Sequence, residues 1–187
     1  GCPVCAEPGG ACAPCAERPP AFAGTVSAAA YRGVAKSAIQ ALKFKGRRRL
    51  APCLAARLAE APGFPAGEWL LVPVPLHPER RRKRGFNQAA LIAREVARAR
   101  RLPWREAIER TLATDPQHVL DRRSRLANLD EAFRCRTSLA GQRVLLVDDV
   151  MTTGATAHAA ALALLAAGAE EVRVLVVART LPPGYPS

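Results

Sequence analysis

The stretch "RVLLVDDVMTTGAT", residues 143–156, decides the fold of this chain. Its four apolar residues, 144–147, predict a buried strand that runs directly into two adjacent carboxylates, Asp148 and Asp149. A buried strand gains nothing from ending on paired negative charge, so a ligand is the expected reason for it. Small residues suited to receiving an anion come next: Thr152, Thr153, Gly154, Ala155 and Thr156.

The residues after this turn complete a βαβ unit. A helix is predicted over residues 155–167, with Gly168 as its C-terminal stop, and a second strand over residues 172–177. Strand, helix and strand in this order predict a parallel sheet with a right-handed crossover. Ligands of such sheets bind at the carboxyl ends of the strands, where the acids and the hydroxyl residues fall.

The two halves of the turn suit different parts of one ligand. Free N–H groups at the helix start attract an anion, Gly154 lets the backbone approach it, and threonine hydroxyls can donate to phosphate oxygens. A carboxylate aimed at phosphate would repel it, so Asp148 and Asp149 are expected to accept hydrogen bonds from hydroxyl groups. A sugar diol with a phosphate one carbon beyond the ring meets both demands. The alternative is that Asp149 only caps the helix and Asp148 faces solvent.

Length and composition favour one globular domain with a small appendage. The chain has 187 residues, of which 49% are hydrophobic, so global disorder is not expected. No apolar run reaches the ~18 residues of a membrane-spanning helix, and the Cys- and Pro-rich start lacks the core of a signal peptide. A cytoplasmic protein without membrane insertion is therefore expected. Neither G-x-G-x-x-G nor G-x-x-x-x-G-K-[ST] occurs, which disfavours a dinucleotide fold and a P-loop NTPase.

Periodicity predicts further elements along the chain. An apolar strand or edge segment is expected over residues 21–31, a buried strand over 68–75, and helices over 31–46, 50–59, 84–101 and 114–129. The second of these strands and the helix at 84–101 are separated by a basic loop. Asp115 and Pro116 are the expected start of the last helix. Val34, Ala38, Ile39 and Leu42 give the helix at residues 31–46 its apolar period, and Leu91, Ile92 and Val96 are expected to point inward from the helix at residues 84–101.

The net charge of +12 is concentrated in three clusters, residues 43–49, 80–84 and 121–125. Basic clusters of this kind suit phosphate-rich partners such as nucleotides, pyrophosphate or nucleic acid. Any single cluster can also be only a solvated surface. Three together favour a polyanionic partner.

Four of the six cysteines lie in two C-x-x-C pairs, formed by Cys2, Cys5, Cys12 and Cys15. This spacing can place four thiolates around one tetrahedral Zn²⁺, and the flanking prolines and glycines favour tight turns. Since four thiolates leave no coordination position open, such a zinc ion is expected to be structural. A pair of disulfides or a redox motif is the alternative. Cys53 and Cys135 are expected to be packing residues.

The stretch "VLLVDDVMTTGAT" resembles the phosphoribosyl pyrophosphate (PRPP) signature of type I phosphoribosyltransferases. The resemblance implies that Asp148 and Asp149 bind the 2′ and 3′ hydroxyls of the ribose, and that residues 152–156 hold the 5′-phosphate. Purine-salvage members carry an Asp general base at the position of Thr152, so a purine acceptor of that kind is not expected here.

The order of the remaining motifs resembles the ComF-type competence family over nearly the whole chain. These motifs are "YRGVAKSAIQALKFKG", "VPVPLHPERRRKRGFNQAALIA" and "TDPQHVLDRRSRLANLDEAF". The resemblance implies a zinc ribbon over residues 1–20 and a phosphoribosyltransferase-like α/β domain with a Rossmann-like parallel sheet over residues 21–187. It also places Val74, Pro75 and Leu76 in a pyrophosphate loop followed by Arg84, Asn87 and Gln88, and Gln117, Arg125 and Asn128 in a mobile hood.

Two functions follow from these residues and the resemblance. In the first, Arg84 and Arg125 neutralise pyrophosphate as it leaves C1′ of PRPP with Mg²⁺, and an unidentified acceptor takes the phosphoribosyl group. In the second, a non-catalytic protein that binds PRPP serves DNA uptake and contacts single-stranded DNA or a helicase-like partner. Arg80, Arg81, Arg82 and Lys83 are the nucleic-acid candidates, and His77 is expected to be a turn residue.

Overall fold

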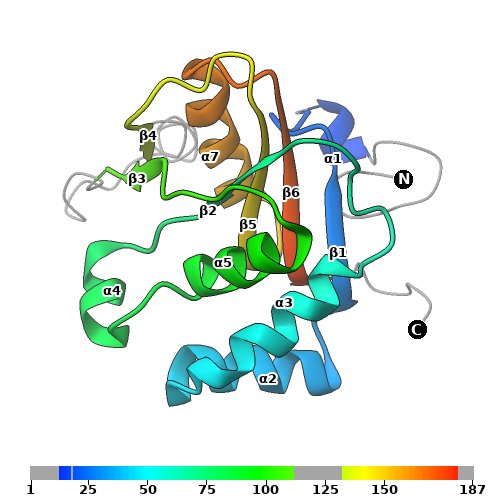
Figure 1. Ribbon diagram of the computed structural model, residues 1–187, viewed down its shortest axis with the longest axis vertical. Helices are drawn as coiled ribbons and strands as arrows, with labels where there is room; N and C mark the ends of the chain where they lie inside the picture. The colour runs from blue at the N-terminus through cyan, green and yellow to red at the C-terminus, as the bar shows by residue number, and fades with distance from the viewer. Residues whose placement is uncertain (1–12, 18, 112–131, 181–187) are drawn as a thin grey trace.

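A four-stranded parallel sheet forms the centre of the protein, with the strand order β1-β6-β5-β2 (Figure 1). The computed structural model describes residues 13–17, 19–111 and 132–180. The strands are β1 (Thr25–Ala30), β2 (Leu70–Pro73), β5 (Arg143–Met151) and β6 (Glu171–Arg179). The predicted α/β fold with a parallel sheet is confirmed. The strand with the two acids lies inside the sheet, between β6 and β2.

Strand β5 is longer than the sequence predicted. It continues past Val147 through both acids to Met151, and Asp148 pairs with Val176 of β6. The strand can continue because β6 also extends beyond residues 172–177 and so supplies backbone partners. Helix α7 (Ala155–Ala166) joins the two strands. The βαβ unit is therefore confirmed, but the acids lie within its strand and not in a turn.

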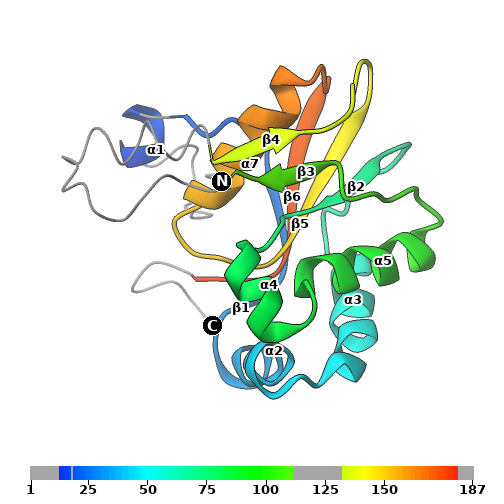
Figure 2. The ribbon, with the colours of Figure 1, turned by 90° about the vertical axis from the view of Figure 1, so that its left-hand side faces the viewer.

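The helices cover the two faces of the sheet unequally (Figure 1). Helix α7 lies on one face, while α2 (Gly33–Lys45), α3 (Ala51–Ala59) and α5 (Gln88–Arg100) lie on the other. The 3₁₀ turn η1 (Arg48–Leu50) joins α2 to α3. Figure 2 shows the short antiparallel strands β3 (Ile108–Arg110) and β4 (Phe133–Cys135) beside α7, with α4 (Pro78–Arg84) between them and α2.

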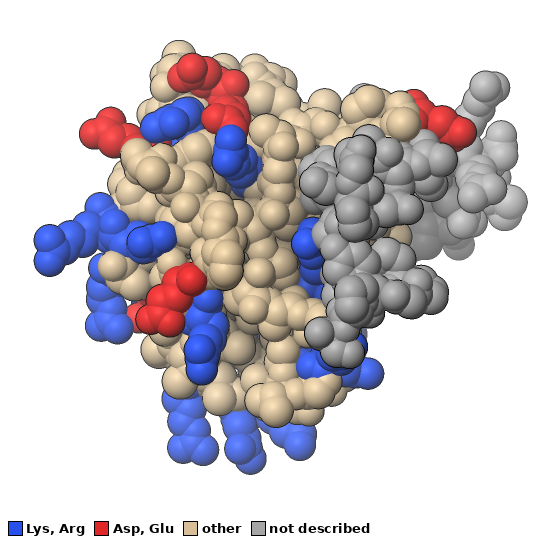
Figure 3. Space-filling view, turned by 90° about the vertical axis from the view of Figure 1, so that its right-hand side faces the viewer, with Lys and Arg blue, Asp and Glu red and all other residues tan. Residues whose placement is uncertain are grey.

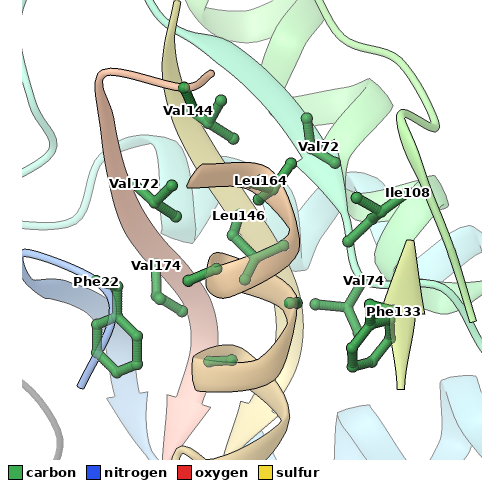
Figure 4. Packing of buried hydrophobic residues seen from close by; sticks show 14 of the residues in the cluster. Phe22, Val72, Val74, Ile108, Phe133, Val144, Leu146, Leu164, Val172 and Val174 are labelled. Carbon is green, nitrogen blue, oxygen red and sulfur yellow. The ribbon is translucent and has the colours of Figure 1, made fainter. Parts of the chain in front are cut away.

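Strand alternation divides the core into two clusters. Val144 and Leu146 pack with Leu164 of α7 on one face of β5 (Figure 4). Leu145 and Val147 belong to the cluster of α2, α3 and α5 on the opposite face. Because side chains alternate between the faces of a strand, an uninterrupted apolar run fits a sheet that is covered on both sides.

Several predicted details of the helices and cysteines are wrong. Val34, one of the apolar residues that gave its helix a period, is 86% exposed and does not belong to the buried face, whereas Leu91 is partly buried and packs against the core as predicted. The basic run at residues 80–84 belongs to helix α4 and not to a loop. Cys53 is exposed, so it is not a packing residue, whereas the Cys135 thiol donates to the Ala107 carbonyl.

Parts of the sequence prediction lie outside the described residues. Cys2, Cys5 and Cys12 are among them, so the zinc ribbon and the domain boundary after residue 20 stay predictions. The short helix α1 (Ala13–Glu17) carries Pro14 and Cys15, where a tight turn was predicted. The helix predicted over residues 114–129 also lies outside. Within the described ranges, no helix is both long enough and apolar enough to cross a membrane.

Candidate functional site

A small hollow lies at the carboxyl end of β5, against the first turn of α7. Its lining includes Asp148 and the whole of the predicted anion loop. The wall opposite the loop is completed by Val174 and Val176 of β6. The structure therefore brings together the first acid and the threonine-glycine loop, as the sequence predicted. The loop residues that line it are Thr152, Thr153, Gly154, Ala155 and Thr156.

The loop presents backbone and hydroxyl donors at the start of α7. Gly154 is the N-cap residue and has a φ of 77°, a left-handed conformation that favours glycine. Glycine has no side chain to cap the helix, and among the first backbone N–H groups that of Ala155 donates to Thr153 Oγ1 at 3.4 Å. Thr152, Thr153 and Thr156 are exposed around this point. The arrangement suits an anion of phosphate size.

Asp148 occupies the hollow as a half-buried carboxyl group. Its Oδ1 accepts a hydrogen bond from the Asp149 backbone N–H at 2.8 Å. Burial raises the pKa of Asp148 well above its usual value, and the negative charge of Asp149 raises it further. A ligand that donates hydrogen bonds or carries a cation would relieve this cost, which fits the predicted diol.

Asp149 is held differently from its neighbour. It is 2% exposed, its Oδ1 accepts from the Val150 N–H at 3.0 Å, and its Oδ2 lies 2.6 Å from Lys43 Nζ of α2. The alternative that Asp149 caps the following helix is therefore wrong. Lys43 was not predicted as a site residue, although it follows the inward-facing Ile39 by four residues, a spacing that places both on one helix face.

The predicted pyrophosphate loop follows β2 at the same edge of the sheet. Val74 donates its N–H to the Val147 carbonyl at 2.9 Å, which ties the loop to β5. The buried Asn87 donates to the Val74 carbonyl at 3.0 Å and accepts from the Ala89 N–H at 3.0 Å, so it joins the loop to the start of α5. Pro75 and Leu76 follow, partly buried, as expected for a loop at a strand end.

Arg84 ends helix α4, close enough to Asp149 for that charge to act on it. Its guanidinium donates to Gln88 Oε1 and lies 5.6 Å from the centre of the Phe44 ring. Burial lowers the pKa of Arg84, the charge of Asp149 raises it, and that of Arg80 lowers it. Burial and Arg80 also lower the pKa of Arg110 on β3. Three guanidinium groups therefore share one neighbourhood, and Arg110 is a site candidate that no sequence motif revealed.

Comparisons with known proteins agree with this arrangement. Residues 90–183 match the family model of the phosphoribosyl transferase domain. The chain is 35% identical over 192 residues to DNA utilization protein YhgH of Escherichia coli K12, covering 96% of this chain and 84% of that protein. This chain belongs to the ComF-type phosphoribosyltransferase family. Competence protein F of Haemophilus influenzae is 36% identical over 113 residues, 58% of this chain and 49% of that protein. Competence protein ComFC of Bacillus subtilis is 31% identical over 140 residues, 74% of this chain and 56% of that protein.

Among the remaining predicted residues of this ComF-type chain, residues 77 and 80–83 lie in the described part of the structure. Residues 80–83, the nucleic-acid candidates, are exposed on α4, and Arg81 lies 3.7 Å from Glu106 in an exposed ion pair. His77 is the N-cap of α4 and accepts from the Glu79 N–H at 3.4 Å, which agrees with its expected role in a turn. Gln117, Arg125 and Asn128 lie outside the described residues, between β3 and β4.

Proposed function

We propose that this ComF-type protein binds PRPP with Mg²⁺ at the hollow beside α7. The observation that carries the proposal is that Asp148 and residues 152–156 line one hollow at the N-terminus of a helix. The helix start and the threonine hydroxyls would hold the 5′-phosphate, and Asp148 would accept from the ribose hydroxyls. Asp149 is buried and pairs with Lys43, so its role would be to fix β5, the strand that contains Asp148, against α2.

The leaving pyrophosphate belongs on the β2 side of the site. The backbone of residues 74–76 and the Arg84 guanidinium lie there, and Arg80 and Arg110 add positive charge. Such groups stabilise negative charge as it develops on the leaving group. If transfer occurs, the C1′–O bond to pyrophosphate breaks while a nucleophile forms the new bond at C1′. Arg125 is proposed to join these residues.

Magnesium fits the residues at this edge. Carboxylate oxygen is a preferred ligand of Mg²⁺, and the raised pKa of Asp148 reflects negative charge that a cation would stabilise. Asp148 would hold the ion together with oxygens of PRPP. When bound, the ion supplies charge neutralisation for the leaving pyrophosphate.

Calorimetry with PRPP and Mg²⁺ tests the binding site. The Asp148→Asn variant is expected to bind at least ~10-fold more weakly, because its amide cannot replace a charged acceptor. Glu170→Gln is the matched control, since Glu170 is exposed and lies away from the hollow. Equal affinity of Asp148→Asn and Glu170→Gln would contradict the proposal. Transfer is tested separately by pyrophosphate release with a panel of nitrogenous acceptors, and no release with any acceptor would favour the non-catalytic alternative.

A role in DNA uptake is the second proposal, supported by the printed names of the relatives and by a composite basic surface. Two clusters that are separate in sequence meet here: Arg48 donates to the Gly85 carbonyl at 3.3 Å and lies 4.7 Å from the Phe86 ring centre. Phe44, which is 75% exposed, lies beside Arg84. On the face turned away from α4, basic side chains also project from the end of the molecule at the bottom of the view (Figure 3). Single-stranded DNA, or a helicase-like partner carrying it, suits this surface.

Binding of an oligothymidylate at increasing salt tests this surface. Replacing Arg82 with Gln should weaken binding and reduce the slope of log affinity against log salt by about 0.7. Arg57→Gln on α3 is the control, because Arg57 is equally exposed but outside the composite surface. An unchanged slope in the Arg82 variant would remove α4 from the contact. Metal analysis of the purified chain tests the proposed zinc ion, and one zinc per chain is expected.

A further inference from the structure

A second cavity lies at the opposite edge of the sheet from the PRPP hollow. Its volume is about 670 Å³, and the first residues of β2 and β5, Leu70 and Arg143, lie in its wall. The segment after α5, residues 101–105, forms the other side. The cavity is within the size range of small-molecule sites in proteins. None of the residues assigned to PRPP lines it.

The cavity combines two indole rings with three guanidinium groups. Both tryptophans of the chain, Trp69 and Trp104, line it, together with Arg101, Arg105 and Arg143. Trp69 is 3% exposed and forms a fixed wall, since its Nε1 donates to the Ala66 carbonyl at 3.0 Å. Trp104 is 38% exposed, so part of its ring remains accessible.

The arginines in this cavity are not neutralised by ion pairs with described residues. Among the described residues, no ion pair includes Arg101, Arg105 or Arg143, and Glu68 is the single carboxylate in the lining. Arg105 donates to Gln142 Oε1 at 3.0 Å, but its Nε is buried without a hydrogen-bond partner. A buried donor without a partner is costly unless a ligand or water satisfies it.

Two of these arginines have unusual local surroundings. The Arg143 guanidinium lies 4.7 Å from the Trp69 ring centre. It passes so close to Gly67 that a Cβ there would lie 2.8 Å from Arg143 Nη2. Arg101 ends α5 in the left-handed conformation, with a φ of 56°, which is uncommon for a residue other than glycine. Such positions persist where the surrounding structure requires them.

We propose that this cavity binds a nucleotide, with its base against Trp104 and its phosphate between Arg101 and Arg105. An indole ring provides a stacking surface for any base, and arginine pairs with phosphate through two parallel hydrogen bonds. Glu68 is placed to accept from an amino group of the base or a sugar hydroxyl. The site is independent of the proposed PRPP function, because it shares no residue with it.

Intrinsic fluorescence tests the proposal on the full chain, since both tryptophans line the cavity. Titration with GMP and with AMP should quench the emission to saturation, whereas inorganic phosphate should require at least ~10-fold higher concentration because it cannot stack. An oligonucleotide of the same base distinguishes a free nucleotide from a unit of a strand, and either source supports nucleotide recognition. No saturable change with nucleotide or oligonucleotide, or equal affinity for phosphate alone, would overturn the proposal.

Variants locate the binding within this cavity. Trp104→Leu and Arg101→Gln should each weaken nucleotide binding about 10-fold by calorimetry, while Trp104→Phe keeps an aromatic ring and should lose little. Arg57→Gln controls for the loss of one positive charge, and thermal melting confirms that each variant folds. In a Thr153→Glu background, which places a negative charge in the PRPP loop, nucleotide binding should be unchanged. Loss of binding in that background would place the nucleotide in the other hollow and refute the assignment.

Discussion

Two neighbouring residues of one strand, Asp148 and Asp149, have opposite electrostatic surroundings. Asp149 is almost fully buried and has Lys43 within 2.6 Å. Asp148 lines an open hollow, where burial and the charge of Asp149 raise its pKa. The protein therefore neutralises the charge of Asp149 with its own Lys43, whereas the charged form of Asp148 remains unfavourable.

The difference indicates which acid is available to a ligand. A carboxylate that already has a cation and a backbone N–H as partners gains little from a new donor. A carboxylate with a raised pKa gains from any ligand that donates hydrogen bonds or supplies positive charge. The motif predicts the same role for both acids, whereas the structure pairs Asp149 with Lys43 and leaves Asp148 at the hollow, so we propose that Asp148 is the one that meets the ligand. The following substitutions test that division.

Removing Lys43 should have the largest effect on stability. Lys43→Ala leaves the buried Asp149 charge without its cation, and the loss of a partner from a buried pair is expected to cost about 2–4 kcal/mol. Lys45→Ala, two residues away on the same helix and exposed, should change stability by less than about 0.5 kcal/mol. Urea denaturation measures both. Equal stabilities would mean that the pair contributes nothing to folding.

Asn87→Ala should have the next largest effect, because it removes both a buried hydrogen bond to Val74 and a helix cap. A destabilisation of about 1–3 kcal/mol is expected. Asn87→Asp keeps the acceptor that caps α5 but loses the donor to Val74, so its loss should be intermediate. If Asn87→Asp were as stable as the unaltered chain, the contact with Val74 would be irrelevant to folding.

Gly154→Ala tests the loop on the Asp148 side. A side chain at a φ of 77° is expected to cost about 1–2 kcal/mol and to weaken PRPP binding. Gly24→Ala is the control, since a Cβ at Gly24 meets no atom within 4 Å and its backbone is not left-handed. Thermal melting and calorimetry measure the two effects. A Gly154→Ala variant that melts and binds normally would show that the left-handed conformation is not required.

Asp148→Asn should have the smallest effect on stability and, unlike the preceding substitutions, should increase it. Because the native pKa of Asp148 lies above the unfolded value, the native state holds more protons than the unfolded state once the pH exceeds about 4, so stability falls as the pH rises from there through the native pKa. The amide removes this loss, so Tm at pH 7 should rise by ~2–4 °C, the shift that ~1 kcal/mol gives in a chain of this size. At pH 3 the two proteins should melt together. A variant less stable than the unaltered chain at pH 7 would refute the raised pKa.

The parts of the fold that depend on local sequence could be predicted. The run at residues 144–147, the small-residue helix after it and Gly168 predict the βαβ unit, because each element is determined by neighbouring residues. The end of β5 could not be predicted, since it depends on how far β6 extends beside it. Helix α4 was mistaken for a loop, although Pro78 at its start and Gly85 after its end are ordinary helix boundaries.

The candidate site also has parts that the sequence could predict and parts that it could not. The threonine-glycine loop and Asp148 are contiguous in sequence, so a motif could reveal them together. The contact of Lys43 with Asp149 and the proximity of Arg110 to Arg80 join segments that are distant in the chain, so no spacing predicts them. The cavity at the other edge was missed for the same reason, because its arginines and tryptophans come from three separate segments.

Arg84 belongs to both the proposed PRPP site and the basic surface. The charge of Asp149 raises the pKa of Arg84, and the Arg84 guanidinium also lies beside the exposed Phe44. Two anions that both require this guanidinium must compete, and thermodynamic reciprocity makes each reduce the affinity of the other by the same factor. If both proposals hold, a higher cellular concentration of PRPP would lower the affinity of the protein for DNA. The protein would then couple nucleotide metabolism to DNA binding.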